Sequence, residues 1–473
     1  MAAAVVPVLV HVPVQVALAL VRAVEGKVIK NTFHKLFYRE EIPIQNPPRG
    51  LYSYHLDTHE GYSHIHLRVD EGGDGLLIIN ANRVLHLNNS AALMAFVYLE
   101  NFPENLALKM LTHNFRVSKP HAKNDYAKFV QEFSDIITPS DLCPIHDLDI
   151  EVTFPFSSRP SAPYRMDLAI TYLCNNNCLH CYNQPQRINT ELSTSDWKTI
   201  LSKLWDIGIP HVVFTGGEPT LRQDLSELIA FAQKKGQVTG LNTNGRRLSD
   251  IHYVNQLVDS GLDHVQITVE SHDPDIHDNM VNHKGAWVQT VEGIKNVLDS
   301  PLYVMTNTTL LKQNSPSLSS TLKFLADLGV PTIGLNGLIY SGRGQNVGTG
   351  LSEGDLPELL ELARESTDQH QQRLIWYTPT EYCHFDPMQL ELGVKGCTAA
   401  LYNMCIEPDG SVIPCQSFYE GLGNILTVPW KSIWEHDRAK WLRDRQYIRE
   451  ECTDCVLLAE CGGGCPLVNL DMR

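Results

Sequence analysis

Short apolar runs alternate with longer amphipathic stretches from Tyr164 to Ile339, and this alternation predicts the main fold. The apolar runs have the length and bounding turns of buried strands: Arg165–Tyr172, His211–Phe214, Val238–Asn242, His264–Val269, Tyr303–Leu310 and Thr332–Ile339. The stretches between them have helical periodicity: Thr194–Ile207, Leu221–Lys235, Ser249–Ser260, Trp287–Leu298 and Pro316–Leu328. Six strand–helix repeats predict parallel strands joined by right-handed crossovers. Because a closed barrel needs eight strands, we expect an α/β fold built on a partial, TIM-like (β/α)6 barrel.

The region before the barrel, residues 51–138, has the pattern of a small α+β domain. Three runs in it predict strands: His64–Val69, Leu76–Asn80 and Arg83–Leu87. The run Asn88-Asn-Ser90 then offers an N-cap for an apolar helix over Ala91–Leu99.

Two segments beside this domain are interpreted from composition and pattern. In residues 1–50, valine occupies every even position from Val6 to Val16, a period of two that predicts a strand or packing arm. No basic segment precedes its apolar stretch, so a secretory signal is not expected. Polar residues and prolines interrupt the stretch and argue against a membrane span: Pro7, His11, Pro13 and Gln15. Residues 139–163 contain five prolines and are predicted to be a linker, with Cys143 as an isolated thiol.

Overall composition narrows the class of protein. Hydrophobic residues make up 43% of the chain and charged residues 19%, as in soluble globular proteins. The formal net charge of −16 argues against a nucleic-acid partner, since phosphate binding depends on clustered lysine and arginine. We expect a cytoplasmic protein, with membrane attachment unlikely.

Three cysteines fall within eight residues just after the first predicted barrel strand: Cys174, Cys178 and Cys181. An odd number of crowded thiols favours metal or redox chemistry over disulfides in a cytosolic chain. Cysteine thiolates hold iron–sulfur clusters, normally four to a cubane, so three local ligands would leave one iron open. A structural zinc site is the alternative, and His180 is the nearest candidate for its fourth ligand.

Two further motifs end the second and third predicted strands, at the edge where parallel sheets bind ligands. In Thr215-Gly-Gly-Glu-Pro219 the paired glycines let the backbone approach a ligand, and Glu218 can accept hydrogen bonds from an amine. The second motif is Asn242-Thr-Asn-Gly245. A Gly-Gly-Glu-Pro turn is common by itself, but beside a cysteine loop it indicates a binding site.

The cysteine loop, the Gly-Gly-Glu motif and the β/α repeats together resemble the radical S-adenosylmethionine (SAM) enzymes. The resemblance implies a 4Fe–4S cluster on Cys174, Cys178 and Cys181, whose open iron binds the amino and carboxylate groups of SAM. It also implies one-electron cleavage of SAM to methionine and a 5′-deoxyadenosyl radical, which abstracts hydrogen from a substrate. The protein would supply placement and a water-poor site.

The same resemblance implies cofactor-binding roles for other residues. Gly216, Gly217 and Glu218 match the segment that holds the methionine amine. His180 stands where relatives often place an aromatic residue against the adenine, and Thr268 matches a hydroxyl near the ribose and carboxylate.

The anchor of the SAM carboxylate departs from the family pattern. Relatives usually carry one or two arginines in the segment that corresponds to Asp275–Gly285, but this chain has Asn279 and Val281 there. We therefore expect Lys284 or Arg343 to take that place.

A denser group of cysteines lies near the C-terminus: Cys397, Cys405, Cys415, Cys452, Cys455, Cys461 and Cys465. Two zinc ribbons could use such spacings. The pattern resembles the SPASM extension of radical SAM peptide and protein maturases. That resemblance implies one auxiliary cluster on four residues, Cys397, Cys405, Cys415 and Cys465, and a second on Cys452, Cys455 and Cys461. The last cysteine of the family pattern is absent, which leaves the second cluster without a fourth thiolate, for which Cys383 is a candidate stand-in.

Residues 51–138 loosely resemble the peptide-recognition module of ribosomal-peptide maturases, similar to the small chaperone of pyrroloquinoline quinone biosynthesis, in which a leader peptide adds a strand to a sheet edge. A plain structural cap is the alternative for this region. The whole then resembles a maturase that cross-links, epimerises or otherwise oxidises a peptide with a leader, using an electron donor such as flavodoxin or ferredoxin. The alternatives are oxidation or decarboxylation of a small molecule such as a tetrapyrrole, and a non-catalytic zinc scaffold.

The expected order of domains follows from these observations. It is an apolar arm (1–50), a peptide-recognition domain (51–138), a linker (139–163), a radical SAM core (164–345), a helical connector (346–395) and a cysteine-rich Fe–S domain (396–473).

Overall fold

The computed structural model describes residues 9–11, 27–30, 47–58, 61–80, 83–137, 151–153, 160–184 and 190–469. The chain divides into two compact units: a smaller one of Val5–Ser161 with Trp205–Pro210, and a larger one that includes Ala162–Leu204 and His211–Arg473. Most of the Val6–Val16 alternation, most of the predicted linker, and Cys143 lie outside the described residues.

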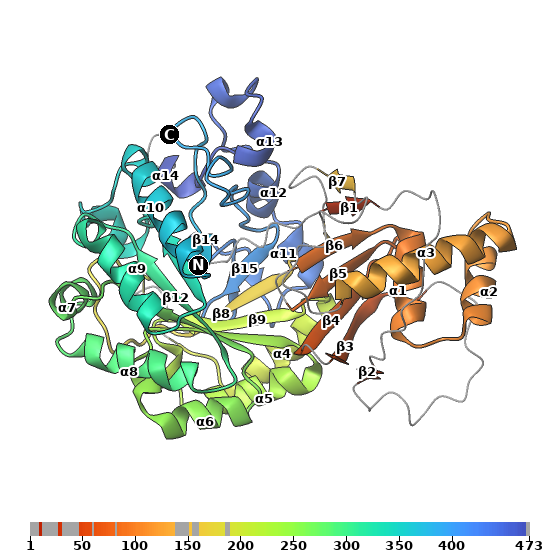
Figure 1. The fold of residues 1–473 in the computed structure, drawn as a ribbon, viewed down its shortest axis with the longest axis horizontal. Coiled ribbons are helices and arrows are strands. Elements are labelled where there is room, and N and C mark those ends of the chain that lie inside the picture. Colours follow the sequence, from red (N-terminus) through yellow and green to blue (C-terminus); the bar gives the residue numbers. More distant parts are fainter. Residues whose placement is uncertain are drawn as a thin grey trace. The chain divides into compact units, whose positions relative to one another are not determined.

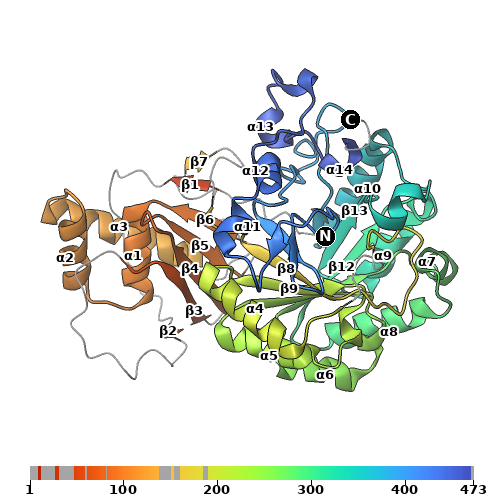
Figure 2. The same cartoon turned by 180° about the vertical axis from the view of Figure 1, so that it is seen from behind.

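Six parallel strands form the centre of the larger unit (Figure 1): β8 (Arg165–Thr171), β9 (His211–Gly216), β10 (Val238–Thr243), β11 (His264–Thr268), β12 (Tyr303–Thr309) and β13 (Thr332–Asn336). Helices connect them: α4 (Thr194–Ile207), α5 (Leu225–Lys235), α6 (Ile251–Asp259), α7 (Pro274–Val281), α8 (Ala286–Leu298) and α9 (Leu318–Asp327). Figure 2 shows α4, α5, α6 and α8 along the outer side of this sheet. The predicted partial barrel is confirmed.

Burial explains why these segments adopt these structures. Every residue of β8 and β9 is buried, as expected for parallel strands that are covered on both faces. Helix α4 buries Trp197, Ile200, Leu201 and Leu204, which recur at the spacing of one helical face.

A seventh parallel strand follows the six predicted ones. Strand β14 (Arg373–Trp376) pairs with β13, directly after helix α10 (Leu356–Gln369). The connector that was expected to be helical therefore contains a strand. The chain reverses at Gln371, whose φ of 56° is a left-handed conformation more typical of glycine or asparagine. A glutamine does not indicate a left-handed conformation, so the sequence did not predict that the helix ends here and a strand follows.

The C-terminal region extends the same sheet. Strand β15 (Asn403–Ile406) pairs in parallel with β8, and β16 (Ser411–Ile413) and β17 (Gly423–Asn424) follow as antiparallel strands. The ten strands lie in the order β14-β13-β12-β11-β10-β9-β8-β15-β16-β17. Short helices complete the chain: α11 (Trp430–Trp434), α12 (Asp437–Arg443), α13 (Leu458–Cys461) and α14 (Pro466–Asn469).

The smaller unit is an α+β domain, as predicted. Its antiparallel strands lie in chain order: β2 (Lys27–Lys30), β3 (Gly50–Thr58), β4 (Gly61–Val69), β5 (Gly75–Ile79) and β6 (Arg83–Leu87). Three helices follow: α1 (Asn89–Leu99), α2 (Glu104–Asn114) and α3 (Lys119–Ile137). Strands β1 (Leu9–His11) and β7 (Glu151–Thr153) pair with each other as a separate antiparallel sheet.

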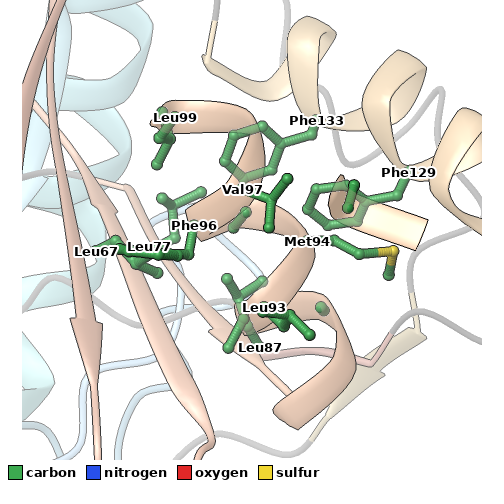
Figure 3. Close-up of a cluster of buried hydrophobic side chains, with 14 of the residues drawn as sticks. Leu67, Leu77, Leu87, Leu93, Met94, Phe96, Val97, Leu99, Phe129 and Phe133 are labelled. Carbon is green, nitrogen blue, oxygen red and sulfur yellow. The ribbon is translucent and has the colours of Figure 1, made fainter. Parts of the chain in front are cut away.

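Helix α1 is the centre of the core of this unit. The Asn88 side chain accepts a hydrogen bond from the Ala91 amide at 2.9 Å, which confirms the predicted N-cap. Figure 3 shows Leu67 and Leu77 of the sheet on one side of this helix and Phe133 of α3 on another. The helix is apolar on nearly all sides because it is enclosed between the sheet and the other helices. Among the described residues, every helix is too short or too polar to cross a lipid bilayer.

Candidate functional site

A cavity of about 1160 Å³ lies at the C-terminal ends of the parallel strands. The predicted site residues on its wall come from the cysteine loop, the second and fourth strands and the segment after the sixth: Cys174, Cys178, His180, Cys181, Gly216, Gly217, Thr268 and Arg343. Glu218 and Lys284 do not line it. The structure therefore brings together eight of the residues that the sequence singled out, from four separate segments.

Backbone hydrogen bonds hold the cysteine loop in place. The amides of Asn177 and Leu179 donate to the carbonyls of Val281 and Met280 at 3.0 Å each, at the end of helix α7. The Cys181 carbonyl accepts a hydrogen bond from the Arg343 amide at 2.8 Å. The loop is thus fixed by segments that follow the fourth and sixth barrel strands.

Two arginines bind the asparagines between the first two cysteines. Arg246 Nη1 donates to the Asn175 carbonyl at 2.6 Å and to the Asn176 side chain at 2.8 Å. The Arg343 guanidinium donates to the Asn177 side chain. Arg246 was not predicted as a site residue, although it directly follows the Asn-Thr-Asn-Gly motif at the end of β10. Arg343, with Lys284 as the alternative, was predicted to bind the SAM carboxylate. It lies on the cavity wall, and its contact with the carboxylate stays a prediction.

The thiols of the loop suit an iron–sulfur cluster better than a single zinc ion. A tetrahedral zinc site would bring its sulfur ligands to within about 4 Å of one another, given zinc–sulfur bonds of about 2.3 Å. Cys174, Cys178 and Cys181 are not gathered within 4.8 Å as a set in the described structure. Burial raises the pKa of Cys174 to about 11 and also raises that of Cys178, so metal binding must displace protons from these thiols.

The two glycines of the Gly-Gly-Glu motif permit a close contact between the ends of β8 and β9. Gly216 has a φ of 129°, and a Cβ there would lie 2.1 Å from the Thr171 carbonyl oxygen. A Cβ on Gly217 would lie 2.3 Å from the Leu173 carbonyl oxygen. The Gly217 and Glu218 amides donate to those same carbonyls at 2.8 and 2.7 Å. Both glycines are therefore required by the backbone geometry.

The substitution Gly217→Ala is expected to weaken SAM binding by about tenfold or more, because the new Cβ must push the turn away from the cysteine loop. Equilibrium binding of SAM to the reconstituted protein measures this. Gly421→Ala is the matched control, since nothing lies within 4 Å of a Cβ at Gly421. Equal affinities for the two variants would contradict the prediction.

Glu218 is fully buried behind the cavity wall. One carboxylate oxygen accepts hydrogen bonds from the Thr220 amide at 3.1 Å, the Thr220 hydroxyl at 2.6 Å and the Thr243 hydroxyl at 2.7 Å. The other accepts from the Asn244 amide at 2.8 Å. Burial raises the pKa of Glu218 while these hydrogen bonds lower it. The side chain joins the turn after β9 to the turn after β10, and its contact with a methionine amine stays a prediction.

His180 has a carboxylate partner that the sequence did not indicate. Its Nε2 lies 3.0 Å from Glu270 Oε1, and both side chains are buried. Glu270 Oε2 accepts a hydrogen bond from the Thr309 amide at 2.9 Å. His180 Nδ1 is buried without a hydrogen-bond partner in the described structure. The imidazole is thus held in one orientation on the cavity wall beside the cysteines.

Neutral amide side chains from four neighbouring strands line the cavity further inside: Asn242, Gln266, Asn307 and Asn336. Asn307 Nδ2 donates to Asn336 Oδ1 at 2.8 Å. Asn242 Nδ2 and Asn307 Oδ1 are buried without a hydrogen-bond partner in the described structure, one a donor and the other an acceptor. Among the described lining residues, Arg343 is the one lysine or arginine. The wall is therefore polar but carries little positive charge.

The predicted ligands of the first auxiliary cluster surround a second cavity of about 670 Å³. Cys397, Cys415 and Cys465 line it, and Cys405 is buried on β15. Burial, followed by the thiols of Cys465 and Cys415, raises the pKa of Cys397. Burial and the nearby Cys415 thiol also raise the pKa of Cys405. Three thiols on one cavity wall, with a fourth buried on the neighbouring strand, suit a cluster held by these side chains.

The ligands predicted for the second auxiliary cluster lie apart from this cavity. Cys452 and Cys455 are joined by a backbone hydrogen bond of 3.1 Å, and Cys461 ends helix α13. None of the three lines either cavity.

Comparisons with known proteins agree with this site. The Radical SAM superfamily model matches residues 168–325, and the SPASM model, an iron–sulfur cluster-binding domain, matches residues 397–456. A PqqA peptide cyclase of Bradyrhizobium diazoefficiens is 29% identical over 318 residues, which are 64% of this chain and 81% of the cyclase. An Fe-coproporphyrin III synthase of Methanosarcina barkeri is 28% identical over 324 residues, which are 62% of this chain and 81% of the synthase.

Among solved structures, the chain is similar to SuiB of Streptococcus suis bound to the precursor peptide SuiA. The TM-score is 0.64 at 16% identity, over 86% of this chain and 95% of SuiB. SuiB has also been solved with bound S-adenosylmethionine. The radical SAM and SPASM domains imply 4Fe–4S clusters and SAM as cofactors. The chain is thus an enzyme with a radical SAM domain over residues 168–325 and a SPASM iron–sulfur cluster-binding domain over residues 397–456.

Proposed function

We propose that this enzyme is a peptide maturase, in which a 5′-deoxyadenosyl radical abstracts hydrogen from a peptide and gives a cross-link, an epimer or another oxidised product. The amide-lined wall of the large cavity is the observation that carries this proposal. Asn242, Gln266, Asn307 and Asn336 line the cavity from four neighbouring strands, and amide side chains can both donate hydrogen bonds to a peptide backbone and accept them from it.

The charge of the cavity favours a peptide over a tetrapyrrole. A tetrapyrrole carries several carboxylates, and buried carboxylates are normally matched by arginine or lysine. Among the described lining residues Arg343 alone is of that kind, and its guanidinium already binds Asn177. A neutral peptide segment needs no such partner.

The smaller unit supports the same substrate class. The match to SuiB covers 86% of this chain, more than the larger unit alone supplies, so part of the smaller unit shares its fold. SuiB was solved with a precursor peptide, and another relative is a PqqA peptide cyclase. A leader peptide could add a strand to an edge of the β2–β6 sheet, a mode that depends on backbone hydrogen bonds.

Within this proposal, each part of the site has a role. Cys174, Cys178 and Cys181 hold the cluster, which supplies the electron that cleaves SAM. Gly216, Gly217 and Arg343 line the same cavity, and the backbone of the two glycines would contact the methionine end of SAM. The His180–Glu270 pair keeps one wall rigid. A small external reductant, such as flavodoxin or ferredoxin, would reduce the cluster.

The direct test uses short peptides encoded beside the gene. Reconstituted enzyme is incubated with SAM, a reductant and each peptide in deuterated water, and the products are analysed by mass spectrometry. Loss of two hydrogen atoms indicates a cross-link or desaturation, and gain of one deuterium indicates epimerisation. The absence of both changes with every peptide, despite SAM cleavage, would contradict the proposal.

Removal of residues 1–137 is expected to abolish turnover of a cognate peptide while reductive cleavage of SAM continues. The reason is that leader binding is assigned to the smaller unit and the cofactor site lies within the larger one. Product peptide and 5′-deoxyadenosine are measured in parallel, so that the second serves as the control for an intact site. Unchanged peptide turnover would leave the smaller unit as a structural cap.

The second candidate function is oxidation or decarboxylation of a tetrapyrrole, which the match to an Fe-coproporphyrin III synthase favours. It predicts that the protein binds an iron porphyrin. Titration of the protein with Fe-coproporphyrin, followed by its absorption spectrum, separates the two candidates.

A further inference from the structure

The second auxiliary site has three thiols from its own loop and no fourth. Cys452, Cys455 and Cys461 lie within ten residues. A 4Fe–4S cluster is normally held by four thiolates. The fourth ligand must therefore come from outside this loop: from another segment of the protein, from solvent or from a substrate.

One segment before the SPASM domain packs directly against this loop. The Tyr382 amide donates to Cys461 Sγ at 3.4 Å, and Cys461 Sγ lies 3.7 Å from the Thr380 carbonyl oxygen. Arg449 forms an ion pair with Glu381 at 2.5 Å and a hydrogen bond with the Cys452 side chain. The segment is thus fastened to two of the three predicted ligands.

This segment presents three side chains that can bind metal. The ligand atoms of Glu381, Cys383 and His384 lie within 4.8 Å of one another. Glu381 is engaged by Arg449, and His384 forms an ion pair with Glu353. Cys383 is exposed. Cys383 directly follows Tyr382, whose amide donates to Cys461 Sγ, so the backbone of Cys383 lies beside the cluster loop.

We propose that Cys383 is the fourth ligand of the second auxiliary cluster, together with Cys452, Cys455 and Cys461. The thiol loses its proton to solvent and its thiolate binds the fourth iron, with no change in the oxidation state of sulfur. Thiolate is also the ligand type that the other three positions supply. The proposal concerns the cofactor alone and holds for either candidate substrate.

The assignment has a structural consequence. Cys383 precedes the first SPASM cysteine, Cys397, so the cluster would join the connector after β14 to the C-terminal loop. A cluster with four protein ligands has no open iron for a substrate. The second auxiliary cluster would then serve electron transfer rather than substrate binding.

Thiol protection in the wild-type protein is the first test, and it needs no variant. Iodoacetamide is added to the reconstituted holoenzyme and to the same protein after removal of iron by a chelator. Peptide mass spectrometry then reports the alkylation of Cys383. Because the side chain is exposed, a free thiol would react in both samples. We expect protection of Cys383 in the holoenzyme and reaction in the iron-free protein; equal reaction in both would overturn the proposal.

The substitution Cys383→Ala is the second test. We expect loss of about one to four irons per chain, because a cubane that lacks one thiolate loses its unique iron or disassembles. Electron paramagnetic resonance should show a three-iron signal in the oxidised protein or the loss of one 4Fe–4S signal in the reduced protein. Cys143→Ala removes a thiol that the sequence assigns to no cluster and is the matched control.

His384→Ala and Glu381→Gln separate the competing ligands. Loss of iron in either variant, with full iron content in Cys383→Ala, would assign the fourth position to that residue and overturn the proposal. Reductive cleavage of SAM, measured in every variant, shows whether the first cluster and the fold are intact.

Discussion

Replacement of Cys178 by alanine is expected to abolish reductive cleavage of SAM and to remove about four irons per chain, the content of one cubane. Two thiolates cannot hold a cluster that leaves one iron open, and Cys178 has no substitute in the loop. Formation of 5′-deoxyadenosine, measured by chromatography, and iron analysis check the two effects.

The auxiliary clusters provide the internal control for this experiment. Their predicted ligands lie outside the cavity that Cys178 lines, so their spectroscopic signals should persist in the variant. Cys143→Ala is again the matched variant. Continued SAM cleavage in Cys178→Ala would refute the assignment of the loop as the SAM-binding cluster site.

The substitution Glu218→Ala is expected to reduce the free energy of unfolding by about 3 kcal/mol or more. It leaves the Thr243 hydroxyl and the amides of Thr220 and Asn244 without their buried acceptor, at about 1–3 kcal/mol for each unsatisfied group. A lower melting temperature of the reconstituted protein would report the loss. SAM binding should weaken as well, since two turns on the cavity wall lose their connection.

Two further variants test whether the effect is specific to this buried carboxylate. Glu227→Ala removes an exposed carboxylate that pairs with Lys198, and it should change stability by no more than about 1 kcal/mol. Glu218→Gln keeps the shape of the side chain but replaces one acceptor oxygen with a donor. Its melting temperature should therefore lie between those of Glu218→Ala and Glu227→Ala. Equal melting temperatures for Glu218→Ala and Glu227→Ala would contradict the role assigned to Glu218.

The partial barrel could be predicted from the sequence because its signals are local. Each buried strand is an apolar run bounded by turns, and the cysteine loop and the Gly-Gly-Glu turn follow two of these strands directly. Parallel strands align their C-terminal ends, so motifs that are distant in the chain had to meet at one edge. The cavity with eight of the predicted residues is the result of that rule.

The missed features depend on contacts that no local pattern encodes. Arg246 binds Asn175 and Asn176, about seventy residues earlier in the chain, and Glu270 pairs with His180 across ninety. An arginine or glutamate that follows a strand usually faces solvent. The sequence alone therefore offered no reason to select Arg246 or Glu270 as a site residue. Only the fold shows which of these charges face the cysteine loop.

In the smaller unit, too, the features that local sequence encodes were predicted and a feature that depends on distant contacts was not. The Asn88 cap and the apolar helix after it were evident, because capping and burial are local properties. Strand β3 was not predicted, although it pairs with β4 along its whole length.

The pairing of β15 with β8 means that the iron–sulfur region shields a strand edge. If the chain ended before Asn403, the backbone groups of β8 on that side would lose their partners, and an open edge of buried, apolar sequence invites aggregation. The strand so exposed is the one that leads into the cysteine loop. The C-terminal region therefore cannot be exchanged or removed as an independent module, because the solubility of the barrel depends on it.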